Sequence, residues 1–170
     1  MSRSSRIIFI FGGIKSGKSQ FLLNIVCRMK KNVTYIATAE RVDDEMKEKI
    51  ELHRQSRPKE WQTIEETKNI TSALDTIKND VIIIECLTTY ISNLMFNNKD
   101  VLKEVKELLD KTLKLEKCVF IVSNEVGHCL VPDNKLGRDF INIVGQVNQE
   151  VAKIANEVYF VKAGIADRLK

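Results

Sequence analysis

Eight residues near the start of the chain have the types and spacing that bind the phosphates of a nucleotide. They read GGIKSGKS and fit the pattern G-x-x-x-x-G-K-[ST] at every required position. In this motif the backbone N–H groups of a glycine-rich turn surround the phosphate oxygens. Lys18 then reaches the terminal phosphates as a catalytic group, and the Ser19 hydroxyl takes a ligand position on Mg²⁺. The predicted contacts are Gly12, Gly13, Ile14, Lys15, Ser16, Gly17, Lys18 and Ser19.

A magnesium-bound nucleotide also calls for a carboxylate at the end of another buried strand. Two candidates follow apolar runs, Glu85 in VIIIEC and Glu125 in FIVSNEVG. Glu85 is favoured because four β-branched residues precede it, which is typical of a central strand whose carboxyl end faces the ligand. A strand-end charge without a function is the alternative. The sequence therefore predicts that Ser19 and Glu85 are the protein ligands of the metal.

The elements that position these residues alternate between strand and helix. Five short, continuous apolar runs predict strands buried on both faces. They cover residues 7–11, 33–37, 81–84, 118–122 and 158–161. Helical patterns lie between them at residues 18–29, 43–53, 71–77, 88–96, 101–115 and 138–155. This order predicts an α/β fold of the P-loop NTPase (RecA-like) type, a mostly parallel sheet with helices on both faces.

Length and composition agree with a single nucleotide-binding domain over residues 1–170. Apolar residues make up 44% of the chain and charged residues 29%, the ordinary range of globular proteins. The net charge of +4 is spread along the sequence without a clustered basic face, so nucleic acid is not an expected partner. The N-terminal apolar run is too short for a membrane span or a signal peptide, which predicts a cytoplasmic protein.

The predicted helix at residues 43–53 ends on a histidine. Asp43 or Asp44 is expected to cap its N-terminus, and Met46, Ile50 and His53 recur at helical spacing on one side. Taken by itself, a histidine that continues an apolar stripe is more often a packing or surface residue than a catalytic one. The residues alone thus indicate a nucleotide-dependent enzyme or switch with an unnamed acceptor.

Several further blocks resemble one family across nearly the whole chain. In chain order they are FGGIKSGKSQF, YIATAERVDDEM, KIELHRQSRPKEW, IIIECLTTYISNLMF and IVSNEVGHCLVPDNKLGRDFINIVGQVNQ. They resemble the bifunctional adenosylcobinamide kinases/adenosylcobinamide-phosphate guanylyltransferases of cobalamin biosynthesis. The P-loop is shared by many proteins, whereas the combination of HxxxRPxxW, ECLTT and SNEVG is far more specific.

The resemblance implies two reactions. ATP or GTP first phosphorylates adenosylcobinamide, and GMP is then transferred from GTP through a guanylyl-histidine to give adenosylcobinamide-GDP. His53 matches the histidine that carries GMP, and imidazole suits this role because a neutral ring nitrogen can attack phosphorus. The family pattern also implies nucleotide contacts from Ala39, Glu40, Arg41, Ser56, Arg57, Pro58, Lys59, Glu65 and Glu85. It further implies a homotrimer with sites near the subunit boundaries, for which exposed apolar surface on the helices after ECLTT would serve.

The chain departs from the family at three places. Leu52 replaces a first histidine that many members carry beside the nucleophile, and Ala39-Glu40 replaces a more polar pair. His128 lies where members vary and is expected to be non-catalytic, and the register leaves open whether Glu65 or Glu66 contacts guanine. Two other functions remain as alternatives: a P-loop small-molecule kinase without guanylyl transfer, and a RecA-like ATP-driven nucleic-acid binder.

Overall fold

The computed structural model describes residues 5–40 and 44–170, and its strands form one seven-stranded sheet. The strands are β1 (Arg6–Gly12), β2 (Val33–Ala37), β3 (Gln62–Glu65), β4 (Val81–Glu85), β5 (Cys118–Asn124), β6 (Glu157–Lys162) and β7 (Ile165–Arg168). Their order in the sheet is β3-β2-β4-β5-β1-β6-β7. All neighbouring pairs are parallel except β6 and β7, which form an antiparallel hairpin. The prediction of a mostly parallel α/β sheet is confirmed.

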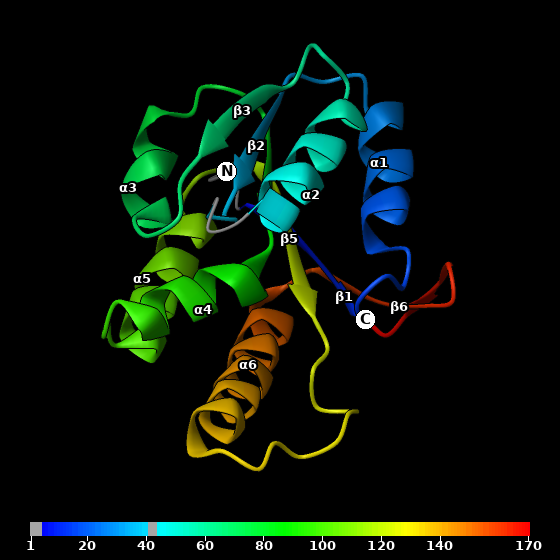
Figure 1. Cartoon of the computed structure of the whole chain (residues 1–170). Helices are drawn as coiled ribbons and strands as arrows, with labels where there is room; N and C mark the ends of the chain where they lie inside the picture. The colour runs from blue at the N-terminus through cyan, green and yellow to red at the C-terminus, as the bar shows by residue number, and fades with distance from the viewer. Residues whose placement is uncertain (1–4, 41–43) are drawn as a thin grey trace.

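Helices cover both faces of this sheet (Figure 1). They are α1 (Lys18–Arg28), α2 (Asp44–Gln55), α3 (Ile70–Ala73), α4 (Leu87–Phe96), α5 (Val101–Leu113) and α6 (Lys135–Ile154), with a 3₁₀ turn at Leu74–Thr76 after α3. Side chains of α3 to α6 pack on one face of the sheet, and α1 packs on the other together with Trp61. Because strand residues alternate between faces, Ile7 and Phe9 join the first core while Ile8 and Ile10 join the second.

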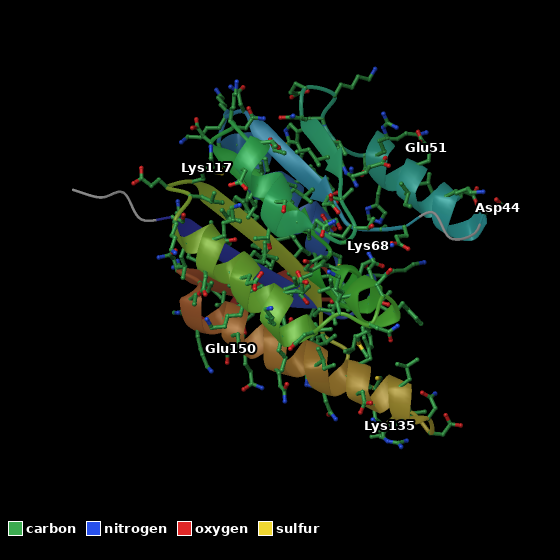
Figure 2. All side chains as sticks on the ribbon, turned by 90° about the vertical axis from the view of Figure 1, so that its left-hand side faces the viewer. Asp44, Glu51, Lys68, Lys117, Lys135 and Glu150 are labelled. Atoms are coloured by element: carbon green, nitrogen blue, oxygen red, sulfur yellow. The ribbon has the colours of Figure 1, made fainter. Side chains whose placement is uncertain are left out.

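The carboxyl ends of the parallel strands meet at one edge of the sheet, and α2 lies at that edge. In Figure 2, Lys117 precedes β5 at one end of the sheet, whereas Asp44 and Glu51 mark α2 at the opposite end. The described residues of α2 belong to neither of the two buried cores. The helix therefore covers the ligand-binding edge of the sheet instead of packing in the interior.

Two strands were not predicted from the sequence, and both have a physical reason. β3 reads QTIE, with one apolar residue, because it lies at the edge of the sheet and is largely exposed. β7 is equally short and exposed, and it pairs with β6 across a tight turn in which Ala163 and Gly164 both have positive φ. The five predicted strands are present, each with bounds within two residues of those expected.

The predicted helix 71–77 is a single α-helical turn that continues as the 3₁₀ turn, and the other predicted helices are present. The expected capping role of Asp43 lies outside the described residues. None of the helices in the described part of the chain is long and apolar enough to cross a membrane.

Candidate functional site

A cavity of about 610 Å³ opens at the carboxyl ends of the central strands. It lies between the glycine-rich loop, the ends of β2, β4 and β5, and the C-terminal half of α2. This is the position at which open α/β sheets bind their ligands. The lining residues are Ile14, Lys15, Ser16, Gly17, Lys18, Ser19, Gln20, Tyr35, Ala37, Thr38, Ala39, Ile50, His53, Arg57, Glu65, Glu85, Cys86, Thr89, Val122 and Asn124.

The glycine-rich loop has the backbone shape that its sequence predicts. Gly17 has a φ of 102°, and helix α1 begins directly after it, so the amide groups of Lys18 and Ser19 in the first turn have no acceptor within the helix. A Cβ on Gly12 would lie 2.2 Å from the carbonyl oxygen of Val161 on β6, so only glycine fits there. The first turn of α1 thus places the amide groups of Lys18 and Ser19 beside the cavity that both residues line.

The C-terminal hairpin supports this loop from outside. Gly164, in the turn between β6 and β7, donates its N–H to the carbonyl of Ser16 over 2.8 Å. A Cβ on Gly17 would approach the Cα of Gly164 to 3.0 Å. Close backbone packing between loop and hairpin therefore fixes the conformation of the phosphate-binding turn.

Lys18 is buried, with its ammonium group held over the loop. Its Nζ donates hydrogen bonds to the carbonyls of Gly12 at 3.1 Å and Gly13 at 2.7 Å. Burial lowers the pKa of Lys18, and the negative charge of Glu85 acts in the opposite direction. In the part of the chain that the structure describes, the partners of this buried cation are carbonyls, so it is poised to contact an anion entering the cavity.

Ser16 has a hydroxyl suited to the same anion. Its Oγ is buried, and among the described residues it has no hydrogen-bond partner. Because buried polar atoms are almost always paired, this orphaned hydroxyl in the phosphate-binding loop fits a site that is completed by ligand oxygens.

Glu85 and Ser19 are adjacent, as expected of two ligands of one metal ion. The Ser19 hydroxyl donates to Glu85 Oε1 at 2.7 Å, and the Tyr35 hydroxyl donates to Glu85 Oε2 at 2.9 Å. One carboxylate and one hydroxyl facing a triphosphate-sized cavity form an oxygen donor set that fits Mg²⁺, which takes few protein ligands and the rest from phosphate and water. Glu125, the rejected candidate, does not line the cavity, and its Oε1 accepts the N–H of Gly127 at 2.5 Å.

Arg57 reaches the cavity from the segment that follows α2. Its guanidinium carbon lies 3.5 Å from the centre of the Tyr35 ring, a cation–π contact. Tyr35 is 4% exposed. Burial is the main cause of its raised pKa, to which the Glu85 charge and hydrogen bond add while Arg57 opposes them. Tyr35 therefore joins the carboxylate of β4 to the guanidinium beyond α2.

His53 lies in the last turn of α2 and lines the cavity together with Ile50. Its side chain is exposed, so of the two non-catalytic readings, a packing residue or a surface residue, the structure leaves the surface one. Leu52, which replaces a family histidine, is 61% exposed and does not line the cavity. The geometry brings one histidine, His53, to the same cavity as the glycine-rich loop.

The side chains of Glu65 and Glu66 lie in different places. Glu65 ends β3 opposite Ala37 of β2 and lines the cavity. Glu66 accepts the backbone N–H groups of Lys68 at 2.9 Å and Asn69 at 2.8 Å. The carboxylate that faces the cavity is therefore that of Glu65.

The structure does not bring all predicted residues to this cavity. Glu40 is half-buried and forms an ion pair with Lys68 at 3.5 Å, and Lys59 is exposed outside the lining. Ser56 and Pro58 instead line a neighbouring hollow beside α1, which Arg57 also borders. Gly12 and Gly13 do not line the cavity, but their carbonyls accept the hydrogen bonds of Lys18 Nζ. Arg41 lies outside the described residues.

Sequence reasoning missed several polar residues of the lining, among them Asn124, Tyr35 and Cys86. Asn124 ends β5 opposite Gly12 and donates through its amide to Cys86 Sγ at 3.6 Å. The strand-end rule that identified Glu85 applies equally to Asn124 and would have found it. Tyr35 and Cys86 had no local signal, because a tyrosine inside a strand and a cysteine after one are common in cores.

Comparison with known proteins gives a consistent result. Residues 8–169 match the family model described as cobinamide kinase / cobinamide phosphate guanyltransferase. The chain is 36% identical to the bifunctional adenosylcobalamin biosynthesis protein CobU of Escherichia coli K12, over 96% of this chain and 99% of that protein. It is 33% identical to CobU of Salmonella typhimurium LT2 over the same shares. Among solved structures, the flagellar accessory protein FlaH of Methanocaldococcus jannaschii has a similar fold, with a TM-score of 0.53, 17% identity, and coverage of 97% of this chain and 78% of that one.

Proposed function

Since the chain belongs to the cobinamide kinase / cobinamide phosphate guanyltransferase family, we propose that its cavity carries out both reactions, with His53 as the guanylylated residue. The chain is a bifunctional enzyme of adenosylcobalamin biosynthesis. The observation that carries the proposed mechanism is that His53 and the glycine-rich loop line one cavity. Phosphoryl transfer and guanylyl transfer both use a bound nucleoside triphosphate, so both need the phosphate-binding loop and the histidine at one cavity.

In the kinase reaction the terminal phosphate moves to the hydroxyl of adenosylcobinamide. The loop amides, Lys18 and the Ser16 hydroxyl hold the triphosphate and balance its charge. Mg²⁺, held by Ser19 and Glu85, would neutralise phosphate charge when it is bound. The oxygen of the acceptor hydroxyl forms the new bond to the γ-phosphorus and gives up its proton to solvent, the bond to the bridging oxygen breaks, and the nucleoside diphosphate leaves.

In the guanylyl transfer a nitrogen of His53 attacks the α-phosphorus of GTP. The P–N bond forms as the bond to the bridging oxygen breaks, and pyrophosphate leaves while the ring loses its proton to solvent. The phosphate of adenosylcobinamide phosphate then attacks the same phosphorus and the P–N bond breaks, which regenerates His53. Arg57, four residues after His53, supplies positive charge for the phosphates, and Glu65 is proposed to accept hydrogen bonds from guanine.

The remaining proposals concern the assembly and its surroundings. We propose a homotrimer in the cytoplasm, as the family resemblance implies, with adenosylcobinamide and its phosphate as the acceptors. Glu40, Arg41, Ser56, Pro58 and Lys59 are proposed to complete the nucleotide site.

The deciding experiment traps the covalent intermediate. Wild-type protein incubated with GTP labelled at the α-phosphate should retain the label after denaturation, and His53→Ala should retain none. The label should be lost at acid pH and be stable at alkaline pH, as expected of a phosphoramidate.

His128→Ala is the matched control, because His128 is the second of two histidines and lies on an exposed loop outside the cavity lining. If His53→Ala still retained the label, a residue other than His53 would be the nucleophile. A wild-type protein that never traps label but phosphorylates cobinamide would support the kinase-only alternative. Salt-dependent binding to DNA or RNA would instead support the nucleic-acid binder.

A further inference from the structure

Tyr35 has no assigned role, yet its side chain contacts two parts of the cavity that the two reactions use. Its hydroxyl donates to Glu85, and its ring face carries the guanidinium of Arg57. We propose that Tyr35 is a positioning residue that holds Glu85 beside the glycine-rich loop and Arg57 beside His53. This inference rests on the proposed function of those residues.

The first contact orients Glu85. The carboxylate accepts one hydroxyl on each oxygen, Ser19 on Oε1 and Tyr35 on Oε2, which fixes its plane. Of these two hydroxyl donors, Ser19 is also a proposed metal ligand. Tyr35 is the one whose proposed role is to orient Glu85. A carboxylate held by a buried phenol is pre-organised for a cation, because it does not have to be ordered when the cation binds.

The second contact holds the segment that carries His53. The described residues of α2 belong to neither buried core, and residues 51 to 56 are exposed. Arg57 follows directly, and its guanidinium lies 3.5 Å from the centre of the Tyr35 ring. Tyr35, 4% exposed on the central strand β2, is a rigid support for this contact. The stack therefore ties the end of α2 to the sheet.

Two substitutions distinguish the two contacts, because one removes a single contact and the other removes both. Tyr35→Phe keeps the ring under Arg57 and deletes the hydroxyl, whereas Tyr35→Leu deletes both. Tyr159→Phe is the matched control, because the Tyr159 hydroxyl donates to Glu157 at 2.7 Å and Arg168 lies over its ring at 5.9 Å, outside the cavity lining. Thermal unfolding of each variant identifies any that does not fold.

The first measurement is calorimetric binding of α,β-methylene-GTP, which cannot donate GMP, with Mg²⁺ and with EDTA. For Tyr35→Phe we expect about tenfold weaker binding with Mg²⁺, the size of a lost hydrogen bond to a charged group, and a change below about twofold in EDTA. Equal losses in both conditions, or no loss, would overturn the proposed role toward Glu85.

The second measurement is the rate of label trapping from GTP at saturating nucleotide and Mg²⁺. We expect Tyr35→Phe to trap at the wild-type rate and Tyr35→Leu to be about tenfold slower, because only the latter loses the Arg57 stack. Equal rates in both variants would overturn the proposed role toward Arg57. If the wild type itself traps nothing, the proposed function fails, and the calorimetric comparison still decides the Glu85 contact. If Tyr35→Leu does not fold, the binding measurement on Tyr35→Phe still tests the role of Tyr35 toward Glu85.

Discussion

At the residue scale, the site contains a cation that the folded protein holds at a cost. Lys18 is 8% exposed, and burial is the main cause of its lowered pKa. Its folded pKa lies below the unfolded value, so the unfolded chain binds more protons between the two values and stability rises with pH there. At any pH below both values, the protonated lysine carries the full cost of burial. Such a cost is expected at a residue kept for phosphate binding.

We therefore predict that Lys18→Met separates stability from function. At pH 7 the nucleotide-free variant should be at least as stable as the wild type in urea unfolding, because no cation is buried. Its affinity for GTP should fall about 100-fold, since charge-assisted contacts to phosphate are lost. Calorimetric binding and denaturation curves measure both.

Lys31→Met serves as the control for this change, because Lys31 is exposed after α1 and lies outside the cavity. A Lys18→Met protein that loses more than about 1 kcal/mol of stability would show that the carbonyl contacts outweigh the burial cost.

At the element scale, the C-terminal hairpin links the phosphate-binding loop to the rest of the sheet. Glu157 begins β6, and its carboxylate accepts the Tyr159 hydroxyl and pairs with Arg6 of β1 and Arg168 of β7. The hydrogen bond from Tyr159, followed by that from Arg6, lowers the pKa of Glu157. One carboxylate therefore contacts side chains of three strands, β1, β6 and β7.

This lowered pKa predicts a pH-dependent stability. A carboxyl group whose folded pKa is depressed stabilises the protein above its unfolded pKa, and that stabilisation is lost as pH falls through the folded value. Glu157→Gln should thus cost about 1 kcal/mol at pH 7. The difference from wild type should shrink as the pH falls below about 4.3, the ordinary pKa of glutamate.

Urea unfolding at pH 7, 5 and 3.5 measures this difference. Glu150→Gln is the control, because Glu150 pairs with Lys153 on an exposed helix face and should change stability by less than about 0.5 kcal/mol at any pH. If the cost of Glu157→Gln were the same at pH 3.5 as at pH 7, packing and not charge would explain it.

The elements themselves differ in how far local sequence encodes them. The continuous β-branched run of β4 and the glycine-rich turn before α1 were predictable because burial on both faces and the phosphate-binding turn each require particular residue types. β3 and β7 were not, since a short exposed edge strand is specified by the neighbour it pairs with.

At the scale of the whole molecule, an apolar surface remains exposed near the start of α6. Leu130 is 93% and Val131 78% exposed, and Leu136 lies close to them in sequence. The helices after ECLTT also expose apolar side chains, Phe96 on α4 and Leu102 on α5. Exposed apolar residues are typical of interaction surfaces, and the more exposed group at Leu130 and Val131 is the better candidate for the contact in the proposed trimer.

We predict that the wild type sediments as a trimer and that the double variant Leu130→Glu/Val131→Glu sediments as a monomer, because each contact would bury two unpaired negative charges. Sedimentation velocity measures both. Leu169→Glu is the control, since Leu169 is exposed elsewhere on the chain. A monomeric wild type would contradict the proposed assembly, and a trimeric double variant would place the contact elsewhere. That residues 1–170 form one domain stays a prediction.

The sequence by itself determined the phosphate-binding loop, the alternation of strands and helices, and Glu85 at a strand end. Each of these is a local property, set by glycines, by spacing or by an apolar run. Only the tertiary structure decided that Tyr35 contacts Glu85 and Arg57 and that Gly164 supports Ser16. These contacts depend on the strand order β2-β4-β5-β1-β6, which brings residues far apart in the chain to one edge of the sheet. No local pattern specifies that order, because it results from packing all the strands and helices together.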